Sequence, residues 1–173
     1  MTPGLRKLAL IAHITFSVGW LGAVAGGLAL TVAGLTSQDA QTVRAAYLAL
    51  ELTARSVIVP LSLASLLTGL IQSLGTEWGL FRHYWVVFKL LITVLATILL
   101  LVHLQAISYM ADVAAGTALS STDFRGLRMD LVLKASLAVL ALLVATTLSV
   151  YKPRGMTRYG WHKQDEQRKV SRL

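Results

Sequence analysis

The sequence predicts an all-α integral membrane protein, a four-helix bundle with both termini in the cytoplasm. Hydrophobic residues make up 55% of its 173 residues and charged residues only 14%, whereas about one quarter of a soluble domain is charged. Four apolar runs have the roughly 20 residues that crossing a hydrocarbon core of about 30 Å requires. The basic residues gather outside these runs, as they do in membrane proteins.

The four runs are the expected transmembrane helices, and they cover residues 8–35, 56–74, 84–107 and 131–151. Each run lacks the alternating pattern of a strand, and a helix satisfies its own backbone hydrogen bonds inside lipid. We therefore expect one transmembrane domain at 1–151, followed by a basic cytoplasmic tail at 152–173.

The first run is too long for the apolar part of a cleaved signal peptide, which has 7 to 15 residues, so we expect it in the mature protein. It carries His13, which lies about 9 Å inside the boundary marked by Lys7, at 1.5 Å per residue. Trp20 shares a helical stripe with His13. Gly22 and Gly26 form a small-xxx-small pair beside that stripe, which suits either close helix packing or a flat ligand such as a porphyrin.

The second run follows an amphipathic segment, 41–55, that we expect to continue into it as one helix. Within that segment Glu51 and Arg55 form an i,i+4 pair at the outer interface. Pro60 predicts a kink early in the run.

The third and fourth runs also carry polar positions. Lys89 and His103 lie near opposite ends of one stripe of the third run, which should therefore face the bundle interior. The fourth run has Lys134 near its start and places Ala138 and Ala141 on the same face, which predicts close packing against a neighbouring helix.

The charge distribution bears on both topology and partners. Seven of the 16 Lys and Arg residues follow the last run, and Arg6 and Lys7 precede the first. This is the positive-inside pattern, so the net charge of +8 indicates membrane topology rather than a nucleic-acid partner. The chain has no cysteine, which excludes disulfides, thiolate metal ligands and iron–sulfur clusters.

Depth sorts the buried ionisable residues into two layers. His13 and Lys89 lie in an inner layer, and Arg55, His103 and Lys134 in an outer one, on the order of 15 to 20 Å away. Two axial histidines must face the same haem iron, so His13 and His103 are not expected to share one haem.

Several interpretations of these residues remain open. His13 is either the single axial ligand of a haem, with Lys89 near the propionates, or a structural histidine hydrogen-bonded between helices, and metal binding or proton transfer is a third interpretation. His103 is an alternative metal ligand or, with Arg55, part of an outer polar network. A copper site made of histidines alone has weak support, because no two histidines are three or four residues apart.

A wider set of residues extends over all four runs. It consists of His13 with Trp20 and Gly22, Arg55 with Pro60 and Gly69, Trp85 with Lys89 and His103, then Phe124 and Arg125 ahead of a last helix that ends at Tyr151, Lys152 and Pro153. This set resembles a known group of four-helix membrane proteins, which includes the HemJ-type protoporphyrinogen oxidases and is similar to the copper-resistance D (CopD) domain.

The resemblance implies a bacterial cytoplasmic membrane protein that binds haem b, with His13 as axial ligand and with Arg55 and Lys89 near carboxylates of the cofactor or substrate. HemJ-type enzymes oxidise protoporphyrinogen to protoporphyrin. The interval from Lys89 to His103 is about one turn longer than in that pattern, and the first helix lacks the second histidine. These departures favour a related member of other function.

We therefore expect a bacterial inner-membrane protein that binds haem b or a related tetrapyrrole through His13, beside Trp20 and Gly22, and has a redox or haem-handling role. The alternatives are a copper-handling protein of the CopD type and an accessory subunit without a cofactor. The expected partners are the lipid bilayer, a small molecule of the tetrapyrrole or quinone type, and a second copy in a homodimer that completes the cofactor cleft.

Overall fold

The computed structural model describes residues 2–75, 83–116 and 124–151, together with residues 155, 157 and 161. The helical elements are α1 (Pro3–Thr36), α2 (Ala40–Thr53), the π-helix η1 (Ala54–Ile58), α3 (Val59–Gly75), α4 (Tyr84–Ala115) and α5 (Arg125–Tyr151). The all-α fold class is confirmed. The predicted basic tail at 152–173 lies almost wholly outside the described residues.

Four helical stretches of the described chain are long and apolar enough to cross a membrane, and each contains one of the predicted runs. They are α1, the stretch Ala40–Gly75 that joins α2, η1 and α3, then α4 and α5. The helices extend beyond the apolar runs because a helix continues through polar interfacial residues that keep its backbone hydrogen bonds. The prediction that the amphipathic segment continues into the second run as one helical stretch is confirmed.

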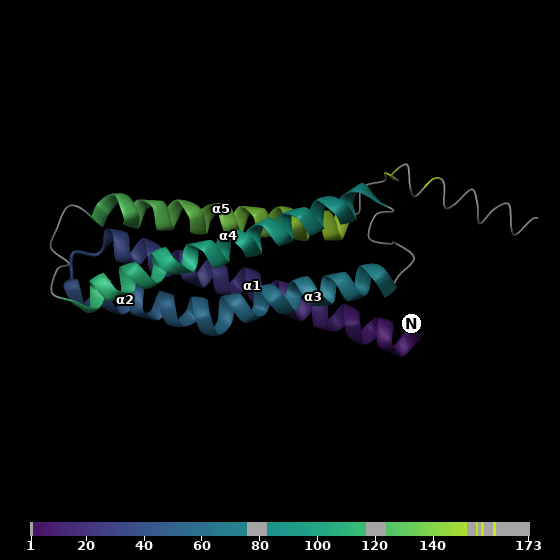
Figure 1. Ribbon diagram of the computed structural model, residues 1–173, viewed down its shortest axis with the longest axis horizontal. Coiled ribbons are helices and arrows are strands. Elements are labelled where there is room, and N and C mark those ends of the chain that lie inside the picture. The colour runs from purple at the N-terminus through teal and green to yellow at the C-terminus, as the bar shows by residue number, and fades with distance from the viewer. Residues whose placement is uncertain are drawn as a thin grey trace, which may run out of the picture.

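The four stretches lie side by side in an elongated bundle (Figure 1). Helix α1 packs against α2, α3 and α5, and α4 packs against the same three helices. Helices α1 and α4 therefore face each other across the centre of the bundle. The start of α1 and the end of α5 lie at the same end (Figure 1), as an even number of spans requires, while the cytoplasmic location of that end stays a prediction.

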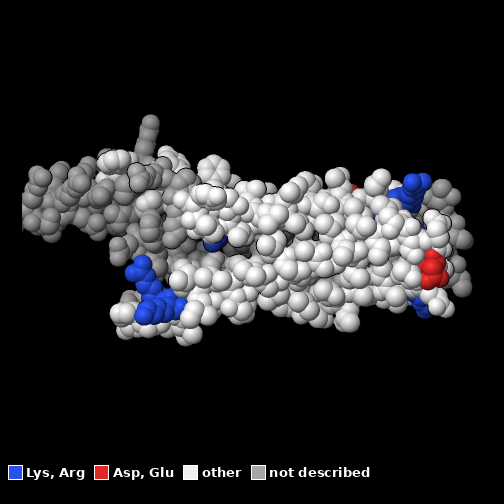
Figure 2. Space-filling view, turned by 180° about the vertical axis from the view of Figure 1, so that it is seen from behind, with Lys and Arg blue, Asp and Glu red and all other residues white. Residues whose placement is uncertain are grey.

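The outer surface of the bundle is apolar over most of its length. On the face seen in Figure 2, most of the charged residues lie toward the two ends and a broad uncharged region separates them. Large apolar side chains point outward from every long helix, including Val18, Leu67, Leu91 and Leu133. So large an exposed apolar surface is typical of contact with lipid and is disfavoured in water.

The π-helix η1 lies directly before Pro60, the residue for which the sequence predicts a kink. Proline has no backbone N–H, and its ring crowds the carbonyl one turn earlier, so the α-helical hydrogen-bond register cannot pass through it unchanged. The chain adopts one wider turn instead, in which the N–H of Val59 donates to the carbonyl of Ala54. Helical structure thus continues from α2 into α3.

Asp39 caps the start of α2. Its carboxylate accepts hydrogen bonds from the backbone N–H of Thr42 at 2.9 Å, the Thr42 hydroxyl at 2.6 Å and the backbone N–H of Gln41 at 3.4 Å. These bonds, with that from the Thr42 hydroxyl as the largest cause, hold the pKa of Asp39 below its ordinary value. The ionised carboxylate therefore stabilises the first turn of α2.

Asp39→Ala is expected to lower the melting temperature of the detergent-solubilised protein at pH 7, because two backbone N–H groups lose their acceptor. Asp39→Asn should lower it less, since the amide oxygen also caps. A group whose pKa falls on folding contributes stability above its unfolded pKa of about 3.9, and that contribution disappears as the pH falls through the folded pKa. The difference between wild type and Asp39→Ala should therefore shrink between pH 7 and pH 3; an equal difference at both values would contradict this assignment.

A fully buried part of the core lies near the end of α1, where α1, α2, α4 and α5 meet. Tyr47 of α2 and Met110 of α4 are fully buried there. The Tyr47 ring lies directly on Gly34 of α1, since a Cβ built at Gly34 would be 2.6 Å from its Cζ. The guanidinium of Arg128 lies 5.9 Å from the centre of the same ring, a cation–π distance. Gly34 therefore sets how closely α1 and α2 approach.

Candidate functional site

The inner polar cluster is built around His13, which α1 points into the bundle and which is 7% exposed. Its Nδ1 lies 3.1 Å from the backbone oxygen of Ser65 and 3.2 Å from Oγ1 of Thr68, both on α3. A carbonyl oxygen can only accept, so Nδ1 carries the proton and donates. This leaves the lone pair of the imidazole on Nε2.

Lys89 is the hydrogen-bond partner of that second nitrogen. Its Nζ lies 3.0 Å from Nε2 of His13, so an ammonium N–H donates to the imidazole across the centre of the bundle. Beside them the hydroxyls of Ser17 and Ser65 are 2.8 Å apart. The cluster ties α1, α3 and α4 together, and it brings His13 and Lys89 into contact as their equal depth predicts.

Gly69 makes room for the imidazole. A Cβ built at Gly69 would lie 3.0 Å from Cε1 of His13, so the ring packs against the backbone of α3. With both nitrogens hydrogen-bonded and one ring edge against α3, His13 has the environment of a structural histidine. Iron ligation through Nε2 would require Lys89 to move away.

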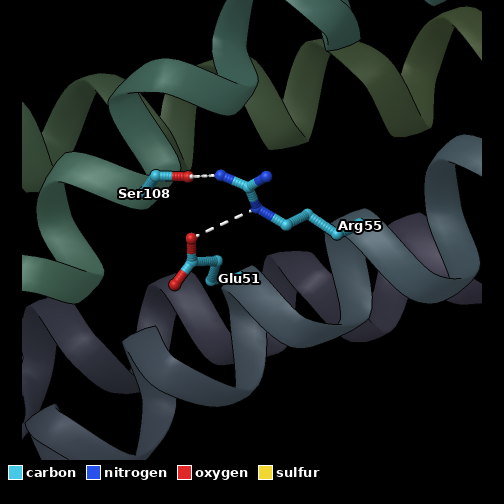
Figure 3. A network of polar contacts seen from close by, with 3 residues as sticks. All are labelled: Glu51, Arg55 and Ser108. Carbon is cyan, nitrogen blue, oxygen red and sulfur yellow. Dashed lines mark hydrogen bonds and ion pairs between the residues drawn. The ribbon is translucent and has the colours of Figure 1, made fainter.

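The outer polar network joins the second helical stretch to α4 (Figure 3). Arg55, which lies within η1, donates from Nε to Oε1 of Glu51 at 3.2 Å and from Nη2 to the hydroxyl of Ser108 at 2.7 Å. The i,i+4 pair is as predicted. Ser108 was not predicted, because a partner on another helix depends on the rotation of α4 and leaves no periodic signal. Lys134 forms its own i,i+4 ion pair with Asp130 on α5.

A pocket of about 570 Å³ lies between α1, α4 and α5, with Leu50 and Ile58 closing one side. Most of its lining is aliphatic. The lining residues are Trp20, Val24, Gly27, Thr31, Leu50, Ile58, Ile92, Leu95, Ala96, Leu99, Leu100, His103, Ile107, Leu131, Lys134, Ala135, Leu137, Ala138, Ala141 and Leu142. Its volume falls within the range of about 300–1,000 Å³ that is typical of small-molecule sites.

His103 is the histidine in the pocket wall. Its Nδ1 lies 3.0 Å from the backbone oxygen of Leu99 and donates to it, which leaves the lone pair on Nε2. A histidine that ligates a metal commonly donates its other N–H to a backbone carbonyl in this way. Along the uninterrupted helix α4, His103 lies about 21 Å from Lys89. Since Lys89 contacts His13, the two histidines occupy separate layers, as the sequence predicts.

Two further side chains distinguish the pocket from an ordinary gap between helices. Trp20 is 3% exposed and lines the pocket, and its Nε1 has no hydrogen-bond partner among the described residues. An unpaired buried donor of this kind invites an acceptor from a ligand or water. Lys134 supplies a cation to the same wall while it pairs with Asp130.

Glycine and alanine positions explain why space remains there. The sequence directs attention to Gly22 and Gly26, but both are exposed, and a Cβ at either would have no atom of the described chain within 4 Å. Gly27 lines the pocket instead. Ala138 and Ala141, expected to pack closely against a neighbour, also line it, so small side chains on α5 leave a void at these positions. A single sequence carries no signal for such a void.

The described residues contain no group of three or more histidine, aspartate or glutamate side chains placed to hold a metal ion. A copper site therefore has no geometric support among them. The homodimer remains a prediction.

Comparisons with known protein families, with curated proteins and with solved structures gave no match to this chain.

Proposed function

We propose that this protein binds haem b or a related tetrapyrrole inside the bacterial cytoplasmic membrane and has a redox or haem-handling role. The site is the pocket between α1, α4 and α5. The observation that carries the proposal is an apolar cavity of about 570 Å³ whose wall holds a histidine with one nitrogen committed to a backbone carbonyl.

The proposal assigns the axial position to His103 rather than to His13. The Nε2 atom of His13 is already hydrogen-bonded to Lys89, whereas His103 lines the cavity and its Nε2 has no hydrogen-bond partner within the described part of the chain. His103 of α4 would hold the iron of a haem bound here, and aliphatic side chains of α1 and α5 would line the rest of the site. His13 then serves the bundle by joining three helices.

The chemistry of the pocket suits an amphipathic macrocycle. Its aliphatic walls match the ring system, while the ammonium of Lys134 is a donor for oxygen atoms of the ligand. Lys134 has three N–H donors, and its pairing with Asp130 uses one of them. An electron-transfer or haem-transfer role is consistent with a cofactor enclosed by apolar side chains, which lower the local dielectric and thereby tune its potential.

The test is an absorption spectrum of the protein purified in detergent, with and without reductant and after reconstitution with haem. Wild type is expected to show a Soret band, His103→Ala should lose it, and His13→Ala should keep it. Elution of each variant as a single peak in size-exclusion chromatography is the control for folding. No Soret band in reconstituted wild type would reject the proposal, and loss of the band in His13→Ala alone would move the axial ligand to His13.

The second candidate is an accessory subunit without a cofactor. Such a subunit needs no ligand at either histidine, and the hydrogen bonds of His13 already satisfy the inner polar cluster. This candidate predicts that wild type shows no Soret band under any loading condition.

A further inference from the structure

We infer that the pocket opens sideways into the bilayer between α4 and α5, and that a phospholipid acyl chain occupies it whenever no cofactor is bound. The ligand then enters from the membrane rather than from water, which makes membrane-partitioned molecules the class that this site accepts. Only one part of this inference rests on the proposed function, namely the identity of the molecule that displaces the acyl chain.

Leucine side chains form the rim of the pocket. Leu95 and Leu99 of α4 and Leu137 of α5 line the pocket, and their exposed fractions are 54%, 51% and 56%. Each of these side chains lines the cavity and is more than half exposed, as expected at the mouth of a pocket. Since the surrounding surface is apolar over its length, the outer side of this rim faces lipid.

Alanine side chains line the walls behind the rim. Where α4 and α5 approach each other, the lining includes Ala96, Ala135, Ala138 and Ala141, and these short side chains leave a slot between the two helices. The part of α4 that lines the pocket runs from Ile92 to Ile107, about 22 Å along the helix axis. The slot is therefore elongated in the direction of the helices, which is also the direction of lipid chains in a bilayer.

Such a cavity is costly when empty, and few of its lining groups can form hydrogen bonds with water. The free-energy cost of a void rises with its volume because the lining atoms lose packing partners. A buried water molecule needs two to four polar partners, and most of the lining is aliphatic, with Thr31, His103, Lys134 and Trp20 as its polar side chains. A flexible hydrocarbon chain from the adjoining bilayer packs against the aliphatic part of the wall, where water has no partners.

The experiment uses Trp20 as a reporter from inside the pocket. A variant with Trp20 as its only tryptophan, made by Trp78→Phe, Trp85→Phe and Trp161→Phe, is reconstituted into phosphatidylcholine vesicles whose acyl chains carry bromine, a contact quencher. We expect bromine to quench Trp20 although the residue is 3% exposed within the protein. Iodide in the aqueous phase should leave its fluorescence unchanged. Quenching by iodide with none by brominated chains would overturn the inference in favour of a water-filled pocket.

Filling the slot is the matched control. In the same background Ala138→Phe, or Ala141→Phe if the first variant does not reconstitute, should lose the bromine quenching because the added ring takes the place of the chain. Quenching that persists at the wild-type level in a folded filled variant would show that bromine acts from outside the bundle, and would overturn the inference.

The two proposals fail separately. Quenching by brominated chains without a Soret band supports the lateral opening and rejects the tetrapyrrole. A Soret band in a protein whose Trp20 is not quenched rejects the lateral opening and leaves the tetrapyrrole in place.

Discussion

Gly34→Ala is expected to destabilise the bundle by about 1–3 kcal/mol, the usual cost of overpacking a filled core. The new Cβ would lie 2.6 Å from Cζ and 2.9 Å from the hydroxyl oxygen of Tyr47, which is closer than atoms can approach. Tyr47 is fully buried, so its ring moves only if its neighbours move with it, or α1 and α2 must separate. Thermal or denaturant unfolding in detergent micelles measures the loss.

The matched control for Gly34 lies on the same helix. Gly22→Ala places its Cβ where no atom of the described chain lies within 4 Å, and alanine is the better helix former by about 1 kcal/mol. We therefore expect Gly22→Ala to leave the unfolding midpoint unchanged or to raise it. Equal losses of stability for the two variants would refute the packing of Tyr47 on Gly34.

Removing both partners of the His13–Lys89 contact should cost less stability than the sum of the losses from removing each one alone. His13→Leu retains an apolar side chain in the core but takes the acceptor away from the Lys89 ammonium, which lies 3.0 Å from the imidazole in wild type. Hydrogen bonds to charged groups contribute about 1.5–3 kcal/mol, and an unpaired buried partner adds its own penalty. We expect a loss of at least this size in unfolding free energy, measured by denaturant titration in micelles.

The double variant His13→Leu with Lys89→Met is the decisive comparison. Methionine has nearly the shape of lysine and no charge, so the double variant contains neither an unpaired ammonium nor an unpaired imidazole. Its loss of stability should be smaller than the sum of the two single losses, by a coupling energy of about 0.5–3 kcal/mol. Additive losses would mean that the two side chains do not interact in the folded protein.

The layer of each ionisable residue was predictable, because depth in a continuous helix follows from counting residues. His13 and Lys89 come into contact as counted, and His103 lies far along the same helix as Lys89. The partners of these residues on other helices were less predictable. Ser108 beside Arg55 and Gly69 beneath His13 depend on how each helix is rotated about its axis.

For the candidate site, too, the sequence identified some residues and the tertiary structure identified others. The sequence singles out His13 because a histidine within an apolar transmembrane run is costly and therefore conspicuous. In the structure, hydrogen bonds to Ser65 and Lys89 offset the cost of burying His13. It also places His103, which resembles an interfacial residue in the sequence, in the wall of the apolar pocket.

By itself the sequence determined that the chain forms four long apolar helices and which polar residues share a depth, although α4 continues beyond its predicted run to Ala115 and α5 begins before its run at Arg125. These properties follow from hydrophobicity, helical rise and the cost of unpaired backbone groups in lipid, all of which act along a single helix. Only the tertiary structure decided that Tyr47 rests on Gly34, that Lys89 occupies the free nitrogen of His13, and that alanines of α4 and α5 leave a pocket rather than a tight contact. Those outcomes depend on helix rotation and on side-chain shapes from three or four helices at once, because packing is a property of the assembled surfaces.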